Sequence, residues 1–468
     1  MMDIRVKYTT RVAGQDILAG DYTAARGNAL AADITQAVLA SGAGVDITAY
    51  PVESIAKTST DPTTGQTVLV GPNGYPLPSS VYGNSLKIKL ANTAGFGTIG
   101  TGYTFCQRWQ LEGVAAGPVE FRFILEFGNN AEFTISSFAV ATGRDGSEVN
   151  AFNADGSAAT WTTASGIVVP AADPDYATNG LVSRVTTPWF EGTMPVKGGA
   201  FYSRLIMPSQ QVGTVGATGS RPISDWQINI NSMLPGLKYF ANHSSGNYVT
   251  ANQGAMPNGT INSEFSPVVG IEIRSGGLVK TFTLDAIGDS TTQELATGSG
   301  ENRKPFNYSW AAKVVNDRIL AGLPWGFQNY AYEGKTASHF LGRYKALCTN
   351  SIGLTGDIAI IQPFSVNGSG FADTVIDANL LLVQDIIALR KAAGRQTIVR
   401  TVFPIKNNAG PTLMAWTRGN RLVRQMDVPV FDAAVLPIVT TDSTHLSLHD
   451  SRDIVAPALD RFLINLGL

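Results

Sequence analysis

Two short polar motifs in the C-terminal part of the chain carry the residue types of a serine hydrolase. Gly288-Asp289-Ser290 follows an apolar run, and the segment from Asp442 to His445 follows another. A serine hydroxyl becomes a nucleophile when a base takes its proton, and histidine commonly does this. A carboxylate three residues before a histidine can, in a turn, reach the ring nitrogen that faces away from the substrate. Ser290, His445 and Asp442 are therefore the candidate nucleophile, base and partner of that base.

Ser290 also has a purely structural interpretation. The segment from Ser290 to Gln293 has the S/T-x-x-E/Q form of a capping box, in which side chains bind free backbone N–H groups at a helix start. Gly288 and Asp289 suit the turn before such a helix. The two interpretations are compatible, because a nucleophile at a helix N-terminus lies near the positive end of the helix dipole.

Histidine is scarce, which narrows the choice of base to 4 residues. His243 lies in a predicted surface turn, His339 in a predicted helix, and His449 at the start of the last predicted helix. Each of these positions gives the side chain a structural reason to be there. His445 differs, because it lies past the carboxyl end of the last predicted strand, while Ser290 lies past that of the first.

The elements that must position these residues change character near residue 280. Before it, short predicted strands alternate with segments rich in Gly, Pro, Asn, Ser and Thr, as in a β-sandwich or jelly roll. One helix is predicted at 29–41, and 50–83 is predicted to be loop or extended arm. The predicted strands include 84–91, 118–127, 199–207 and 268–275.

Beyond residue 280, five predicted strands alternate with helical segments. Such alternation predicts a parallel sheet with helices on both faces, and ligands of such sheets bind beyond the carboxyl ends of the strands. Ser290 follows the first strand and His445 follows the fifth, so both are expected at that edge. The strands are 280–287, 327–332, 357–364, 396–403 and 428–433, and the helices are 306–321, 335–348, 373–394, 412–426 and 451–466.

The chain of 468 residues is predicted to have three parts. These are a region for attachment or oligomerisation at 1–105, a β-rich domain at 106–278, and an α/β domain at 279–468. A net charge of −2 gives no reason to expect nucleic acid as a partner. No membrane span and no secretory signal are found. Cys106 and Cys348 could form one disulfide, but two buried thiols are the preferred interpretation.

Other familiar motifs fail on their context. The segment GFGTIG at 95–100 has the form of a dinucleotide-binding loop, but a predicted strand follows it instead of a helix. Gly334-Lys335-Thr336 resembles the end of a P-loop, but Asn329 stands where that loop needs glycine. Neither G-x-S-x-G nor a Cys/His cluster with zinc spacing occurs. None of these patterns therefore predicts a dinucleotide, a nucleoside triphosphate or a zinc ion.

Together the motifs resemble those of the SGNH (GDSL-type) hydrolase superfamily. Its first block matches Gly288-Asp289-Ser290, and its fifth, D-x-x-H, matches the segment from Asp442 to His445. The second block, N-x-A followed by glycine, matches the segment from Asn329 to Gly334. This resemblance covers residues 279–468 and implies a flavodoxin-like, three-layer α/β/α fold around a five-stranded parallel sheet.

The third block of the family, G-x-N-D, is met only in part. Asn367 matches its asparagine, but Ser365 stands in place of the glycine and Gly368 in place of the aspartate. The resemblance implies that Ser290 attacks an ester carbonyl. It also implies an oxyanion hole formed by the N–H groups of Ser290 and Gly334 and the side-chain amide of Asn367. The implied reaction requires no metal and no organic cofactor.

The resemblance implies an esterase but does not identify the ester. We expect a carbohydrate O-deacetylase that works through an acyl-serine intermediate, because a β-rich region precedes the catalytic domain. Trp161, Trp189 and Trp226 in polar loops could stack on sugar rings, although core packing is the simpler interpretation of each. The alternatives are a lipase or thioesterase of the same superfamily, and a non-catalytic glycan-binding phage tail protein.

Low charge and β-structure rich in Gly, Ser, Thr and Asn also resemble bacteriophage tail proteins, some of which carry SGNH esterase domains. This resemblance implies an acetylated polysaccharide of the bacterial surface as the partner. It allows a homotrimer, and it places the chain on a virion. The alternative location, in the absence of a signal, is the cytoplasm.

Overall fold

The computed structural model divides the chain into two compact units, residues 1–80 with 466–468, and residues 81–465. Helix 29–41 lies outside the described residues. The described residues are 4–6, 49–51, 57–60, 67–70, 86–89, 96–98, 104–110, 114, 116–129, 131–144, 150–175, 179, 181–206, 216–218, 236–243, 268–274, 282–293, 309–321, 325–332, 334–367, 372–404, 410–438, 445–447 and 449–468.

The first unit contains two antiparallel strand pairs. Strand β1 (Ile4–Val6) pairs with β2 (Ala49–Pro51), and β3 (Lys57–Thr60) pairs with β4 (Thr67–Val70). The second pair lies within 50–83, so part of the predicted loop or arm is a β-hairpin. Thr and Val in these segments are residues that favour strands.

The β-rich part of the second unit contains a five-stranded antiparallel sheet with the order β11-β10-β15-β7-β17. The predicted turn at His243 is wrong, because this residue ends β17 opposite Thr104 of β7. The strands are β7 (Thr104–Gln110), β10 (Phe138–Gly143), β11 (Thr162–Ala164), β15 (Ala200–Ile206) and β17 (Gly236–His243).

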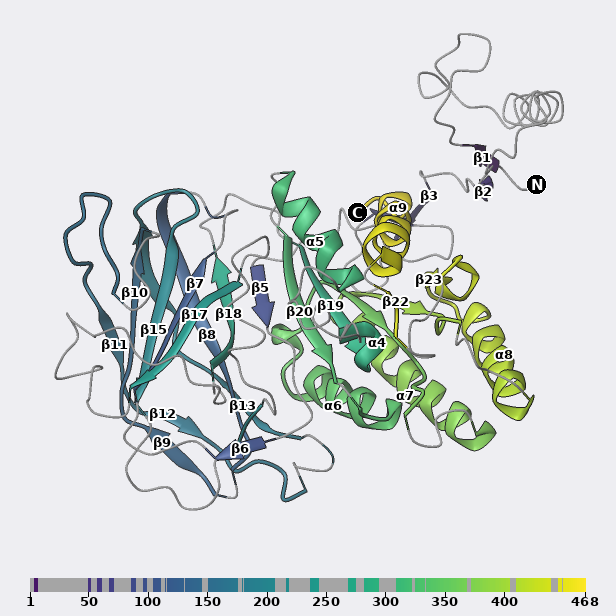
Figure 1. Ribbon diagram of the computed structural model, residues 1–468, viewed down its shortest axis with the longest axis horizontal. Coiled ribbons are helices and arrows are strands. Elements are labelled where there is room, and N and C mark those ends of the chain that lie inside the picture. The colour runs from purple at the N-terminus through teal and green to yellow at the C-terminus, as the bar shows by residue number, and fades with distance from the viewer. Residues whose placement is uncertain are drawn as a thin grey trace, which may run out of the picture. The chain divides into compact units, whose positions relative to one another are not determined.

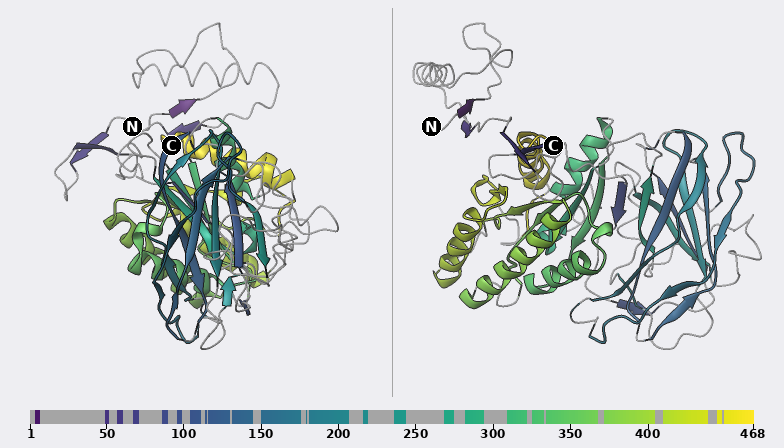
Figure 2. Two further views of the ribbon diagram at one scale, coloured as in Figure 1. Left: turned by 90° about the vertical axis from the view of Figure 1, so that its left-hand side faces the viewer. Right: turned by 180° about the vertical axis from the view of Figure 1, so that it is seen from behind.

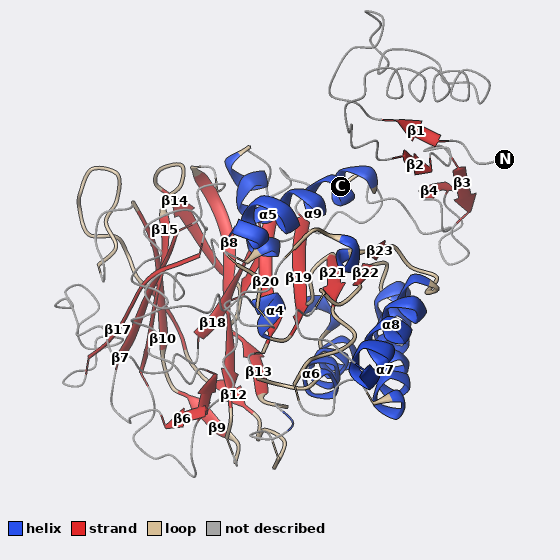
Figure 3. Ribbon diagram, turned by 45° about the vertical axis from the view of Figure 1, so that its right-hand side comes forward, coloured by secondary structure: helices blue, strands red, loops and turns tan. Residues whose placement is uncertain are grey.

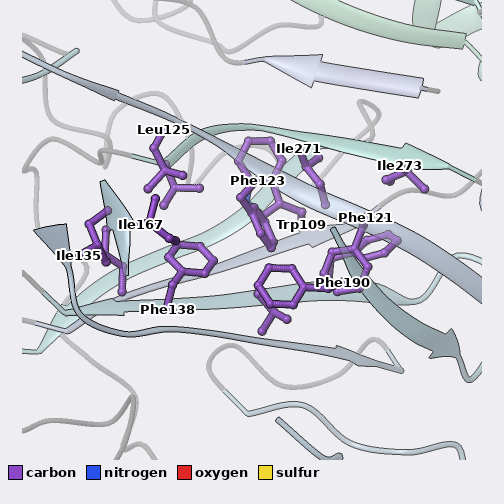
Figure 4. Packing of buried hydrophobic residues seen from close by; sticks show 14 of the residues in the cluster. Trp109, Phe121, Phe123, Leu125, Ile135, Phe138, Ile167, Phe190, Ile271 and Ile273 are labelled. Atoms are coloured by element: carbon purple, nitrogen blue, oxygen red, sulfur yellow. The ribbon is translucent and has the colours of Figure 1, made fainter. Parts of the chain in front are cut away.

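A second antiparallel layer packs on this sheet. Apolar residues alternate along β8 and β18 and pack against Trp109 and Phe138 of the first sheet, which makes the pair a sandwich (Figure 4). The strands of this layer are β5 (Leu86–Lys89), β8 (Gly117–Phe127), β13 (Ser183–Thr186), β14 (Phe190–Met194) and β18 (Val268–Arg274). Two separate antiparallel pairs are β6 (Phe96–Thr98) with β16 (Gly216–Thr218), and β9 (Phe133–Ile135) with β12 (Ile167–Val169).

Strand β5 joins the sandwich to the α/β part in one continuous sheet. It pairs antiparallel with β18 on one side and parallel with β20 (Trp325–Ala331) on the other (Figures 1 and 2). The N–H of Lys87 in β5 donates to Thr283 Oγ1 at 3.0 Å, and Lys87 Nζ lies 3.5 Å from Glu272 of β18. The sheet therefore crosses the domain border predicted near residue 279.

The α/β part contains the five-stranded parallel sheet that alternation predicts. Its order is β20-β19-β21-β22-β23, so the first strand along the chain is flanked by the second and third. The first four of these strands along the chain are buried, as expected for a sheet covered on both faces. The remaining strands are β19 (Phe282–Gly288), β21 (Ile358–Ile361), β22 (Gln396–Arg400) and β23 (Val430–Phe431).

The helices cover both faces of this sheet. Chain direction across the sheet reverses after β20, and right-handed crossovers then put α5 and α6 on opposite faces. Helix α9 packs with α5, and α7 packs with α6 (Figure 3). The helices are α4 (Ser290–Gln293), α5 (Trp310–Leu320), α6 (Ala337–Asn350), α7 (Asp373–Ala392), α8 (Gly410–Arg424) and α9 (Ala456–Asn465), with short turns η3 (Ile352–Leu354), η4 (Ala433–Val435) and η5 (Asp450–Val455).

Helix ends follow local chemistry. Helix α7 ends before Gly394, which has a φ of +68° and so fits the left-handed position that terminates many helices. The last predicted helix, 451–466, is wrong in its first turns, because η5 is a π-helical turn that leads into α9. Predicted strand 357–364 is shorter than expected: β21 ends at Ile361 and leaves the next residues free to turn toward the site.

A buried polar cluster fixes β19 in the sheet. The carboxylate of Asp285 accepts hydrogen bonds from Gln328 Nε2 at 2.9 Å, from the N–H of Gly356 at 2.7 Å and from the hydroxyl of Tyr344. Arg390 Nη1 lies 3.8 Å away. Burial raises the pKa of Asp285, and these donors and the guanidinium oppose that effect. The strand that carries the candidate nucleophile is thus held from both neighbouring segments.

The two cysteines are free and buried, so the disulfide alternative is wrong and the preferred interpretation is confirmed. Burial raises the pKa of Cys106 and that of Cys348 to about 11 each. Within the part of the chain that the structure describes, no helix is both long and apolar enough to cross a membrane.

Candidate active site

The nucleophile turn begins where β19 ends at Gly288. A side chain at this position would collide with Thr292 and Gln362, so the close approach requires glycine. The next carboxylate, that of Asp289, accepts hydrogen bonds from the N–H of Thr291 at 2.9 Å and from its hydroxyl at 2.7 Å. Asp289, and not Ser290, therefore caps the short helix α4, and the predicted capping role of Ser290 is wrong.

Because Asp289 is the cap, the Ser290 hydroxyl is available for another contact, and it faces a histidine. Ser290 Oγ lies 2.9 Å from His445 Nε2, although the two residues are 155 positions apart. Ser290 is 4% exposed and His445 is half-buried, so the contact is partly shielded from water. The contact has the length that proton transfer between a hydroxyl and a ring nitrogen requires.

The other predicted member of the triad, Asp442, lies outside the described residues, whose last segments begin again at His445. Two of the other histidines contact other residues. His339 in α6 packs its ring edge-on against Tyr332, with centroids 5.6 Å apart. His449 is exposed and its Nδ1 lies 2.9 Å from Asp453 Oδ2.

The turn after β20 carries Gly334, with a φ of +69° that favours glycine. The N–H of Tyr332 donates to the carbonyl of Gly288 at 2.9 Å, which ties this turn to the start of the nucleophile turn. Asn329, the asparagine of the second block, is fully buried and its Oδ1 accepts from the N–H of Ala331 at 3.0 Å. Asn329 therefore helps to shape the turn.

The segment that follows β21 brings Asn367 against the same turn. Asn367 Nδ2 donates to the carbonyl of Lys335 at 3.1 Å, next to Gly334. A primary amide has two N–H groups, so one remains for another acceptor. Of the predicted residues, the structure thus brings Ser290 into contact with His445, and Asn367 to the turn of Gly334.

Sequence patterns missed a buried network under the nucleophile turn. Gln362 Oε1 accepts from the hydroxyl of Thr292 at 2.7 Å and also from Arg400, and Arg400 Nη2 donates to the hydroxyls of Thr291 at 3.0 Å and Thr292 at 2.9 Å. Arg400 is fully buried, with its guanidinium 4.3 Å from the Phe403 ring. In the sequence, the only sign of this network is an arginine inside the mostly apolar segment QTIVRTVF.

Two of the three tryptophans proposed for sugar stacking have an arginine side chain over the ring. Arg204 lies over the ring of Trp161 at 4.0 Å, and Arg274 lies over that of Trp189 at 3.9 Å. Both indoles are half-buried. These contacts favour the packing interpretation, and Trp226 lies outside the described residues. No group of His, Cys, Asp and Glu that could hold a metal ion occurs among the described residues.

No protein family model matches the chain, and neither does any curated protein. Similar solved structures include a protein assigned to the G-D-S-L lipolytic family from Desulfitobacterium hafniense DCB-2, 14% identical over 39% of this chain and 99% of that one, at a TM-score of 0.29. Esterase EstA from Pseudoalteromonas sp. is 13% identical over 39% of this chain and 96% of that one, at a TM-score of 0.29. Acetylxylan esterase Axe2 from Geobacillus stearothermophilus is 20% identical over 39% of this chain and 94% of that one, at a TM-score of 0.29.

Proposed function

We propose that the chain is a serine esterase of the SGNH type, with Ser290 as nucleophile and His445 as general base. The observation that carries this proposal is the 2.9 Å contact between Ser290 Oγ and His445 Nε2. Ser290 lies two residues after the end of β19, so the contact with His445 is beyond the carboxyl end of that strand, where ligands of parallel α/β sheets bind. A hydroxyl paired with an imidazole at such an edge is the arrangement that nucleophilic acyl transfer uses.

In the proposed reaction, Ser290 Oγ attacks the ester carbonyl carbon while its proton passes to His445 Nε2. The oxyanion accepts hydrogen bonds from the N–H groups of Ser290 and Gly334 and from the free N–H of the Asn367 amide. Collapse breaks the C–O bond, and the alcohol leaves with the proton from His445. Water then attacks the acyl-serine and gives a proton to His445. The bond from the acyl carbon to Ser290 Oγ breaks, His445 returns the proton to Ser290 Oγ, and the carboxylic acid leaves. Asp442 is the proposed partner that orients His445.

For the substrate we propose an O-acetyl group on a polysaccharide. The support is the β-sandwich that shares a sheet with the proposed catalytic part, because such sandwiches often accompany enzymes acting on polysaccharides. An acetylated glycan of the bacterial surface, a place in a phage tail and a homotrimeric assembly belong to the same proposal.

A chain-length series tests the reaction and the acyl specificity together. With p-nitrophenyl esters, we expect kcat/KM for acetate to exceed that for octanoate by about tenfold or more, because a site shaped for acetyl excludes extra methylenes. Acetate release from a panel of acetylated bacterial and plant polysaccharides then identifies the glycan. Preference for eight or more carbons would support a lipase or thioesterase, and no hydrolysis of any ester would support a non-catalytic glycan-binding protein.

A further inference from the structure

A buried serine joins the three segments that form the candidate site. Ser365 is fully buried, and its Oγ lies 2.7 Å from Asp289 Oδ2, 3.1 Å from the backbone N of Asn367 and 3.1 Å from the carbonyl oxygen of Lys335. Asp289 follows β19, Lys335 follows β20, and Ser365 and Asn367 follow β21. One hydroxyl therefore contacts all three turns at the carboxyl edge of the sheet.

The proton count decides what each contact does. A hydroxyl donates one hydrogen bond and can accept two. The shortest contact is the one to the Asp289 carboxylate, which only accepts, so the Ser365 proton belongs there. Ser365 Oγ in turn accepts from the N–H of Asn367. The carbonyl of Lys335 is satisfied separately, because Asn367 Nδ2 donates to it at 3.1 Å.

Asn367 is thereby held at two points. Its backbone is bound to Ser365 and its side chain to Lys335, which fixes the direction of the second amide N–H. The same Asp289 carboxylate that receives the Ser365 proton also binds Thr291, next to Ser290. A continuous set of hydrogen bonds therefore runs from the nucleophile turn through Ser365 to the Asn367 amide.

We propose that Ser365 is a positioning residue, whose hydroxyl aligns the Asn367 amide with the oxyanion that forms at Ser290. This inference rests on the proposed esterase function. Glycine, which the third block of the SGNH pattern expects at this position, has no hydroxyl and could form none of these side-chain bonds. An oxyanion donor acts through its alignment before the reaction, so a group that fixes that alignment acts mainly on kcat.

A double-mutant cycle between Ser365 and Asn367 tests the proposal with p-nitrophenyl acetate. We expect Asn367→Ala to lower kcat by about 10²–10³ and Ser365→Ala by about tenfold, with KM changed by less than about twofold. Because Ser365 acts through Asn367, the double variant should match Asn367→Ala within about twofold. Ser338→Ala, at an exposed serine that bonds the Thr336 hydroxyl, is the control and should keep wild-type kcat.

Thermal unfolding midpoints report whether each variant is folded. Should Ser365→Ala not fold, Ser365→Cys takes its place, because a thiol is nearly isosteric and a weaker donor, and an intermediate kcat is expected. The inference is overturned by wild-type kcat in the Ser365 variant, or by losses that multiply in the double variant. Full activity of Ser290→Ala would instead overturn the esterase proposal itself.

Discussion

Replacing Ser290 by alanine is expected to lower kcat for ester hydrolysis by about 10⁴–10⁶, because the attacking oxygen is removed while its surroundings stay in place. The surroundings should persist because Asp289, and not Ser290, caps α4, and because Arg400 and Gln362 hold the threonines that follow. Alanine also suits a helical position. Initial rates with p-nitrophenyl acetate, measured against a buffer blank, give the loss.

The thermal unfolding midpoint of Ser290→Ala is the control for this prediction and should lie close to that of the wild type. A folded Ser290→Ala protein with a kcat within tenfold of the wild type would contradict the assignment of the nucleophile. A residual rate above the blank is compatible with it, since oxyanion donors and substrate binding still contribute.

Replacing His445 by alanine is expected to lower kcat by about 10⁴–10⁶ as well, because the serine proton then has no acceptor at the 2.9 Å position. The matched control is His449→Ala, at an exposed histidine that contacts Asp453, and it should keep wild-type kcat. The double variant Ser290→Ala/His445→Ala should be no slower than Ser290→Ala, because the two residues act as one unit. Additive losses, or equal losses in the two histidine variants, would argue against His445 as the base.

Most of the α/β part could be predicted from sequence, because its signals are local. Its third strand, for example, is the continuous apolar run IAII, and helix α7 ends just before Gly394. The place of β5 could not be predicted. A strand of four residues carries no sign of its neighbours, and β5 enters the sheet between two segments far along the chain, β18 and β20.

Some residues of the candidate site could likewise be predicted from sequence, and others could not. Ser290 and His445 were predicted because their motifs sit at strand ends, and the structure brings these two side chains together. The capping residue was predicted wrongly, because Asp289 and Ser290 are equally good caps by type and only the fold decides between them. Arg400 and Ser365 were missed as partners, since a buried hydrogen-bond network depends on contacts between distant turns.

Covalent labelling with a fluorophosphonate tests the central claim most directly, because the reagent phosphonylates only an activated serine. Mass spectrometry of the labelled wild-type protein should show one adduct, and peptide mapping should place it on Ser290. Ser290→Ala should show no adduct, and His445→Ala should react much more slowly than the wild type. An adduct on another residue, or equal labelling of Ser290→Ala and wild type, would contradict the claim that Ser290 is the nucleophile of an esterase.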